Sequence, residues 1–291
     1  MENIVEFKNV SKYFKGFSLK NNDLAIKKGA ITGFIGANGA GKSTTIKLMM
    51  HLLKADEGAI ELFGLNYERN EKEIKERIGF VYDENVFYEN LDLETLHTII
   101  APAYVSWDER QFEYYIEQFD LPMDKTLKTF SKGMQMKVSL AIALSHDAEF
   151  IIMDEPTAGL DPTFRREMLN ILRNLMVEEQ RTIFFSTHIT SDLDKIADHI
   201  AFIHDGKILF NQSMNSLLNQ YLLVKGKQEV LIENPDLRQL FIHFEQTTTE
   251  FQGLTDQIDE VNARFARKVE LESATLEDIM YFMIGVKRED A

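Results

Sequence analysis

Four short stretches of this sequence contain the residues best suited to chemistry. They are residues 36–43, 131–135, 150–155 and 186–188. The first combines glycines with a lysine, the third ends in two carboxylates, and the fourth ends in a histidine. The first stretch alone predicts phosphate binding, because such a pattern surrounds an anion with backbone N–H groups and one fixed positive charge.

The first stretch reads Gly-Ala-Asn-Gly-Ala-Gly-Lys-Ser and matches the phosphate-loop pattern G-x-x-x-x-G-K-[ST]. Apolar residues before it predict a strand at Ile31–Ile35, and apolar residues at helical spacing predict a helix over 44–53. A strand, a loop and a helix in this order direct a positive helix end at the anion. A glycine-rich turn with an unrelated lysine would lack that context. The expected nucleotide contacts are Gly36, Ala37, Asn38, Gly39, Ala40, Gly41, Lys42, Ser43 and Thr44.

Within this loop, Gly36 and Gly41 allow turn geometry and a close backbone approach that a Cβ atom would obstruct. We expect Lys42 to reach the β- and γ-phosphates of a nucleotide and the Ser43 hydroxyl to ligate Mg²⁺.

The third stretch predicts a buried parallel strand that ends in Asp154 and Glu155. Ligands of open α/β sheets bind at the carboxyl ends of the strands. We expect Asp154 to hold Mg²⁺ through water and Glu155 to polarise the water that attacks the γ-phosphate. An acid pair after a strand is a weak signal by itself, and the neighbouring phosphate loop makes it specific.

Taken together, residues 1–212 resemble the ATP-binding subunit of an ABC transporter. Residues 154–162 fit the family's Walker B and D-loop run, and residues 131–134 stand where its signature occurs. Residues 138–144 continue the helix expected after the signature, and residues 186–188 match the switch histidine. No other common phosphate-loop class combines these motifs at these intervals.

The resemblance implies further site residues. His188 would contact the γ-phosphate, and Asp161 would lie close to the nucleotide. Ser131 and Gly133 of a second subunit would complete the site. An aromatic ring at Phe14, or alternatively at Tyr13, would stack on adenine.

Two departures from the family pattern fall near the site. After residues 77–82, where glutamine is usual, the sequence has Asp83. Asp83 is a candidate Mg²⁺ ligand, and the alternative is a loop that only contacts the membrane subunit. Lys132, Gly133 and Met134 replace Gly-Gly-Gln in the signature. This variant resembles exporters of peptides, toxins and antibiotics.

Composition excludes several other functions. The chain has no cysteine, which excludes disulfides, thiolate zinc sites and cysteine nucleophiles. The chain has 47 acidic against 32 basic residues, a net charge of −15 and no long basic run. This bulk balance argues against nucleic-acid binding, which usually shows a basic surface, and no nucleic-acid partner is expected. No apolar run approaches the ~20 residues of a membrane helix. If the chain serves a transporter, the membrane part is another chain, and this subunit is expected as a peripheral protein on the cytoplasmic face of the membrane.

The predicted fold is α/β: a phosphate-loop NTPase core with a small antiparallel layer in residues 1–35. A helical insertion is expected at about 85–145. The expected domains are an ABC ATPase domain at 1–212 and a small α+β accessory region at 213–291. Within that region, residues 228–232 are strand-like, and Thr275 with Asp278 predicts a helix start.

A single phosphate loop and a single signature imply a second ATPase subunit, identical or related, because the family binds each ATP between two subunits head to tail. The expected cofactors are ATP and Mg²⁺, and the expected membrane partner is a separate multi-helix subunit. Two alternatives are a non-transport ABC ATPase and a regulatory module that has lost catalysis. The presence of Lys42, Asp154, Glu155 and His188 argues against the second.

Overall fold

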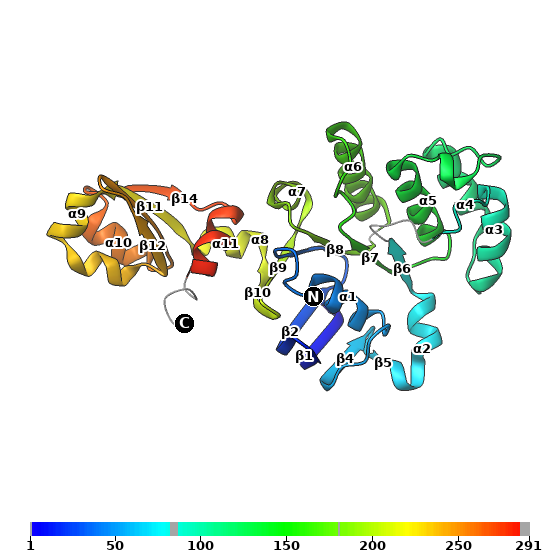
Figure 1. Cartoon of the computed structure of the whole chain (residues 1–291), viewed down its shortest axis with the longest axis horizontal. Coiled ribbons are helices and arrows are strands. Elements are labelled where there is room, and N and C mark those ends of the chain that lie inside the picture. The colour runs from blue at the N-terminus through cyan, green and yellow to red at the C-terminus, as the bar shows by residue number, and fades with distance from the viewer. Residues whose placement is uncertain (1, 82–86, 180, 286–291) are drawn as a thin grey trace. The chain divides into compact units, whose positions relative to one another are not determined.

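The computed structural model describes residues 2–81, 87–179 and 181–285, which form two compact units (Figure 1). The first unit extends to Asn211 and the second begins at Gln212. Each unit has its own cluster of buried apolar side chains.

The first unit contains two sheets. The smaller is antiparallel where its pairings are defined, with the order β2-β1-β4-β5. Its strands are β1 (Asn3–Phe14), β2 (Phe17–Lys27), β4 (Glu57–Leu62) and β5 (Leu65–Asn66). The predicted antiparallel layer is therefore confirmed for β1 and β2, whereas Ile31–Ile35 belongs to the other sheet.

The larger sheet has the order β10-β9-β3-β8-β7-β6. Its strands are β3 (Ile31–Ile35), β6 (Ile78–Val81), β7 (Phe150–Asp154), β8 (Thr182–Thr187), β9 (His199–His204) and β10 (Lys207–Ser213). The pairings β9-β3, β3-β8, β8-β7 and β7-β6 are parallel. Every residue of β3 and β8 is buried, as expected of strands covered on both faces.

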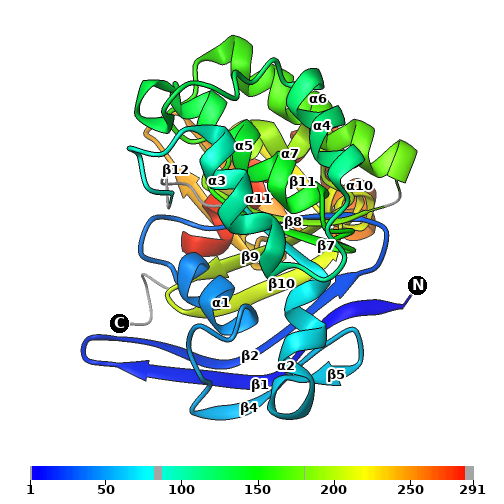
Figure 2. The same ribbon diagram turned by 90° about the vertical axis from the view of Figure 1, so that its right-hand side faces the viewer.

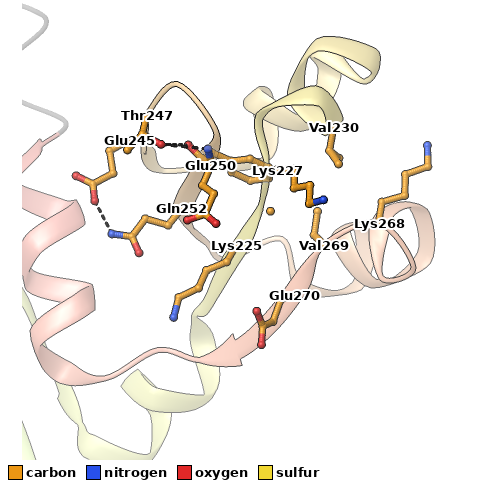
Figure 3. Close-up of a pocket in the computed structure, with 12 residues that line it drawn as sticks. Lys225, Lys227, Val230, Glu245, Thr247, Glu250, Gln252, Lys268, Val269 and Glu270 are labelled. Atoms are coloured by element: carbon orange, nitrogen blue, oxygen red, sulfur yellow. Dashed lines mark hydrogen bonds between the residues drawn. The ribbon is translucent and has the colours of Figure 1, made fainter.

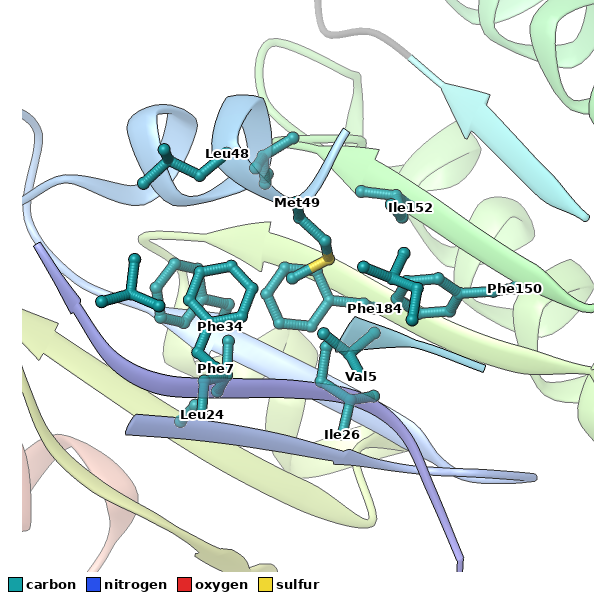
Figure 4. Packing of buried hydrophobic residues seen from close by; sticks show 14 of the residues in the cluster. Val5, Phe7, Leu24, Ile26, Phe34, Leu48, Met49, Phe150, Ile152 and Phe184 are labelled. Atoms are coloured by element: carbon teal, nitrogen blue, oxygen red, sulfur yellow. The ribbon is translucent and has the colours of Figure 1, made fainter. Parts of the chain in front are cut away.

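Helix α1 (Lys42–Met49) lies between the two sheets (Figure 2). Met49 packs in one apolar cluster with Phe34 and Phe184 of the larger sheet and with Val5 and Ile26 of the smaller one (Figure 4). Because α1 begins at the end of the phosphate loop, the packing of α1 in this core holds the loop in place.

The expected helical region is confirmed, and the helix that precedes Leu121 and Pro122 ends at Gln118. Asp92, Asp108 and Ser131 cap α3, α4 and α5 with their side chains. The helices are α2 (Tyr67–Glu76), α3 (Leu93–Ile100), η1 (Ala101–Ala103), α4 (Glu109–Gln118), η2 (Leu127–Thr129), α5 (Lys132–Leu144), α6 (Pro162–Glu179) and α7 (Thr190–Ile196).

The second unit has a four-stranded sheet with the order β12-β13-β11-β14, antiparallel at each pairing. Its strands are β11 (Leu222–Lys227), β12 (His243–Gln246), β13 (Glu250–Thr255) and β14 (Glu270–Ser273). Its helices are α8 (Met214–Gln220), α9 (Gln228–Glu233), η3 (Pro235–Leu240), α10 (Ile258–Phe265) and α11 (Leu276–Gly285). The strand predicted at 228–232 is wrong, because these residues form α9. The predicted start of α11 is confirmed: Thr275 and Asp278 cap each other.

A cavity of about 600 Å³ opens on the second unit between β11, β13 and the start of β14 (Figure 3). Lysines 225, 227 and 268 and glutamates 245, 250 and 270 line it. Lys225 is paired with Glu272 at 2.6 Å, which raises the pKa of the lysine.

Candidate nucleotide site

The candidate site lies where three neighbouring strands end. Strands β3, β8 and β7 are adjacent and parallel, so their carboxyl ends share one edge of the sheet. The phosphate loop follows β3, His188 follows β8, and Glu155 follows β7. Three of the four predicted motifs are thereby brought together.

The phosphate loop is shaped by its glycines. A Cβ atom on Gly36 would lie 2.4 Å from the carbonyl oxygen of Ile203, and Gly41 has a φ of +116°. The Lys42 ammonium donates to the carbonyl oxygens of Gly36 at 2.8 Å and Ala37 at 3.3 Å. The lysine is thus folded back over its own loop, with its charge held where a phosphate chain would lie.

Glu155 lies between a lysine and a histidine. Its Oε1 is 3.0 Å from the Lys42 ammonium, and its Oε2 is 2.9 Å from Nδ1 of His188. The side chains of Lys42 and Glu155 are only 6% and 14% exposed, whereas His188 is 45% exposed. The ion pair is therefore shielded from water, and the histidine forms the solvent side of the site.

The backbone of Glu155 adopts a left-handed conformation, with a φ of +50°. Its N–H group donates to the hydroxyl and to the carbonyl oxygen of Ser186, each at 3.1 Å. A left-handed residue other than glycine costs about 1–3 kcal/mol and persists where its surroundings enforce it. Ser186 supplies part of that enforcement and fixes the direction of the Glu155 side chain.

The residues present fit a magnesium ion. Ser43 is exposed at the start of α1, and Oδ1 of Asp154 accepts a hydrogen bond from Ser186 Oγ at 2.5 Å. Mg²⁺ in nucleotide sites takes one or two protein oxygens and completes its shell with phosphates and water. One hydroxyl and one carboxylate held in a fixed orientation suit that role, and no group of three or more candidate ligands occurs among the described residues. Asp83, the third predicted ligand, lies outside the described residues.

The signature residues lie at the start of α5. Ser131 is exposed, and its Oγ accepts from the N–H of Met134 at 3.2 Å. Gly133 is buried against Phe164 of α6, whose ring a Cβ atom would approach to 2.7 Å. Asp161 caps α6 by accepting from the N–H groups of Thr163 and Phe164 at 3.0 Å.

Phe14 and Tyr13, the two candidates for adenine stacking, differ in their contacts. Phe14 is 44% exposed and stacks on Phe17, with ring centroids 6.3 Å apart. Phe17 in turn lies against the phosphate loop, 3.1 Å from where a Cβ of Gly41 would be. The Tyr13 hydroxyl is instead bonded to Glu57 at 3.0 Å. These contacts favour Phe14.

Sequence reasoning missed two residues of this arrangement: Phe17, and Asp192, whose buried carboxylate accepts a hydrogen bond from Thr157 in the loop after Glu155. Phe17 was one more aromatic residue near Phe14, and Asp192 was one acid among many. Ser186 was part of a recognised motif, but its contacts with Asp154 and Glu155 were not predicted. The order of the strands is needed to predict contacts of this kind.

Comparison with known proteins shows the family of this chain. The family model described as "ABC transporter" matches residues 19–158. The bacitracin transport ATP-binding protein BcrA of Bacillus licheniformis is 32% identical over 98% of both chains. The chain belongs to the ABC transporter ATP-binding proteins. It is therefore an ATPase that hydrolyses ATP to power transport through membrane subunits.

Solved structures agree with the ABC ATPase fold. The ATP-binding subunit of an ABC transporter has a TM-score of 0.66 and 28% identity, covering 75% of this chain and 92% of that one. A dimeric ATP-binding cassette in a post-hydrolysis state with ADP and phosphate has a TM-score of 0.64 and 23% identity, covering 72% and 98%. Among the described residues, no helix is both long enough and apolar enough to cross a membrane.

Proposed function

We propose that this ABC ATPase powers an exporter of peptides, toxins or antibiotics from the cytoplasmic face of the membrane, through a separate multi-helix membrane subunit. The observation that supports the catalytic part is the contact chain from Lys42 through Glu155 to His188, at 3.0 and 2.9 Å. It brings a phosphate-binding cation, a candidate base and a polar side chain on the solvent side to one sheet edge.

In the proposed mechanism, two subunits bind each ATP head to tail. Lys42 and the loop amides hold the phosphates, and Ser43 and Asp154 would hold Mg²⁺, which would supply positive charge to neutralise the developing negative charge. Glu155 orients and polarises the attacking water, and His188 contacts the γ-phosphate. The exposed Ser131 and the neighbouring Gly133 of the second subunit complete the site from the start of α5. The second subunit is identical to this one or related to it.

The proposed substrate class rests on the Ser-Lys-Gly-Met signature and on the name of the bacitracin transport relative. The test is resistance to bacitracin in cells that express the chain together with the membrane subunit encoded by the neighbouring gene. Resistance that depends on Glu155, and disappears with Glu155→Gln, supports export of such peptides. Full resistance in the Glu155→Gln cells would contradict the proposal.

The membrane subunit needs a docking surface, and a groove of about 530 Å³ beside the helical insertion is the candidate. Its lining is mainly apolar, with Lys72, Lys75 and Glu76 among its polar residues. Tyr104 also lines the groove, whereas Phe112 and Tyr115 of α4 are buried and do not.

Two adjacent isoleucines of α3 test this docking site. Ile100 lines the groove, whereas Ile99 is 58% exposed and does not line it. We expect Ile100→Arg to abolish co-purification with the membrane subunit and leave ATP binding intact, and Ile99→Arg to retain co-purification. Normal co-purification of the Ile100 variant would exclude the groove.

A further inference from the structure

Asp192, which no motif includes, is a completely buried carboxylate in the first turn of α7. Its Oδ2 accepts from the Thr157 hydroxyl at 2.7 Å, and its Oδ1 accepts from Nε of Arg165 at 2.7 Å. A buried charge is tolerated only when it is paired and hydrogen-bonded, and both oxygens of Asp192 meet that condition.

The three residues come from three segments around the site. Thr157 follows Glu155 by two positions, Asp192 follows His188 by four, and Arg165 lies in the first turn of α6, just after Asp161. Asp192 therefore joins the loop that carries the candidate base to the segment that carries the switch histidine.

We propose that Asp192 is a positioning residue for ATP hydrolysis. It acts through Thr157 to hold the side chains of Glu155 and His188 in their positions relative to each other. The inference rests on the roles proposed above for those two residues. Glu155 has a left-handed backbone, and its N–H group is hydrogen-bonded to Ser186 of β8. The Thr157–Asp192 hydrogen bond joins the same two segments a second time, at residues that follow Glu155 and His188 in the sequence. The segment after β7 and the segment after β8 are therefore connected on both sides of the 2.9 Å Glu155–His188 contact.

A purely structural role for Asp192 makes a different prediction. If the network only stabilises the fold, its loss would lower the melting temperature and would affect nucleotide binding and turnover together. If it positions Glu155 against His188, its loss would lower kcat while the KM for MgATP stays the same, because the phosphate loop does not contact Asp192 through any of the hydrogen bonds above.

The test uses two changes at Thr157 in the full chain, assembled with its membrane subunit. Thr157→Val nearly preserves the shape of the side chain and removes the donor. We expect kcat to fall about tenfold, the effect of losing one hydrogen bond to a charged group, with KM unchanged. Thr157→Ser retains the hydroxyl and is expected to restore turnover. Ser191→Ala is the matched control, because it removes a contact to Arg165 at 3.2 Å and leaves Thr157 in place.

A second measurement does not depend on activity. Hydrogen exchange followed by mass spectrometry should show that Thr157→Val speeds exchange in residues 155–161 and 187–193 together, and that Ser191→Ala does not. The proposal would be overturned if Thr157→Val kept the wild-type turnover and the wild-type exchange rates. It would also be overturned if Thr157→Val and Thr157→Ser lowered kcat, raised KM and lowered the melting temperature to the same extent. The Glu155→Gln variant separates a failure of the proposed catalytic site from a failure of the role of Asp192. If Glu155→Gln hydrolyses ATP normally, the proposed catalytic site is wrong. If it is inactive while Thr157→Val is normal, only the role of Asp192 is wrong.

Discussion

Glu155 has two proposed roles in this structure. Its carboxylate is paired with Lys42, the residue that would hold the phosphates, and it is also the candidate base for water. An incoming γ-phosphate must compete with Glu155 for the lysine. The pair therefore links nucleotide binding to the release of Glu155 toward water.

This competition gives a prediction for Glu155→Gln. Turnover should fall about 10²-fold or more, because a positioned base contributes at least that much. ATP affinity should be retained or increased, because the neutral amide competes less well for Lys42. ATPase rates, calorimetry and size-exclusion profiles with ATP measure the three effects, and a closed dimer should accumulate. Turnover at the wild-type rate would remove Glu155 from the mechanism.

Lys42→Ala should act on binding itself. It removes the fixed positive charge of the loop, so the dissociation constant for MgATP should rise at least about tenfold, the value of a hydrogen bond to a charged group. It also leaves the buried Glu155 without its 3.0 Å partner, so the melting temperature should fall. Adding Glu155→Gln should recover the melting temperature and leave the affinity low. An unchanged dissociation constant in the single variant would mean that this loop is not the phosphate site.

At this scale, the sequence predicted individual residues better than their contacts. Lys42 and Glu155 stand in two separate motifs, 113 positions apart in the sequence, but their pairing follows from β3 and β7 lying on either side of β8. No local pattern contains the order of the strands, so the pairings of Ser186 and Asp192 could not be predicted.

Among the elements, α5 combines two roles in one residue. Ser131 caps the helix through the N–H of Met134 and is proposed to contact a nucleotide on the second subunit. Ser131→Asp should preserve the cap, because aspartate caps helices as well as serine does. Its charge would repel phosphate, so ATP-driven dimerisation should be lost.

Ser131→Ala provides the comparison. It should destabilise the chain by about 1 kcal/mol through loss of the cap. Thermal unfolding and size exclusion with ATP, in a Glu155→Gln background, separate the two effects. If Ser131→Asp dimerises normally, this helix end does not face a nucleotide.

The buried His146 makes the stability of the chain depend on pH. It follows the end of α5, is 1% exposed, and stacks on Tyr104 with ring centroids 4.0 Å apart. Burial lowers the pKa of His146 below its ordinary value. Below a pH of about 6.5, the unfolded chain therefore binds more protons at this residue than the folded chain does, and stability falls as the pH falls.

We expect His146→Gln to remove part of this dependence. Melting temperatures at pH 7.5 and 5.5 should differ less in the variant than in the wild type. Equal differences in both proteins would show that His146 titrates in the same way in the folded and unfolded chain.

The incorrect strand prediction at α9 also has a physical cause. Residues 228–232 contain Val230 and Ile232, which favour strands, in an apolar run too short to distinguish the two periods. In the structure only Leu231 of this turn is fully buried, and Ile232 is 64% exposed. By contrast, the expectation of a helical region is confirmed, and α4 within it buries Phe112, Tyr115 and Ile116 at helical spacing.

At the scale of the whole molecule, the proposed catalytic residues and the C-terminal region belong to different units. The proposed site residues lie within the first unit, and the apolar cluster of the second is formed separately, by residues such as Val224, Leu237 and Phe265. The phosphate loop is supported by α1 and by the cores of both sheets of the first unit, so its geometry does not require the second.

This division predicts the behaviour of a chain that ends after Ser213, the last residue of β10. It should fold, melt in one transition and bind MgATP with the affinity of the full chain, because the apolar cluster around α1 remains complete. The informative measurement is ATP-driven dimerisation of this truncated chain in a Glu155→Gln background. Dimerisation as in the full chain would make residues 214–291 a brace or an attachment for other partners. Normal ATP binding without dimerisation would instead assign them a contact between the two ATPase subunits, and loss of ATP binding would contradict the independence of the first unit.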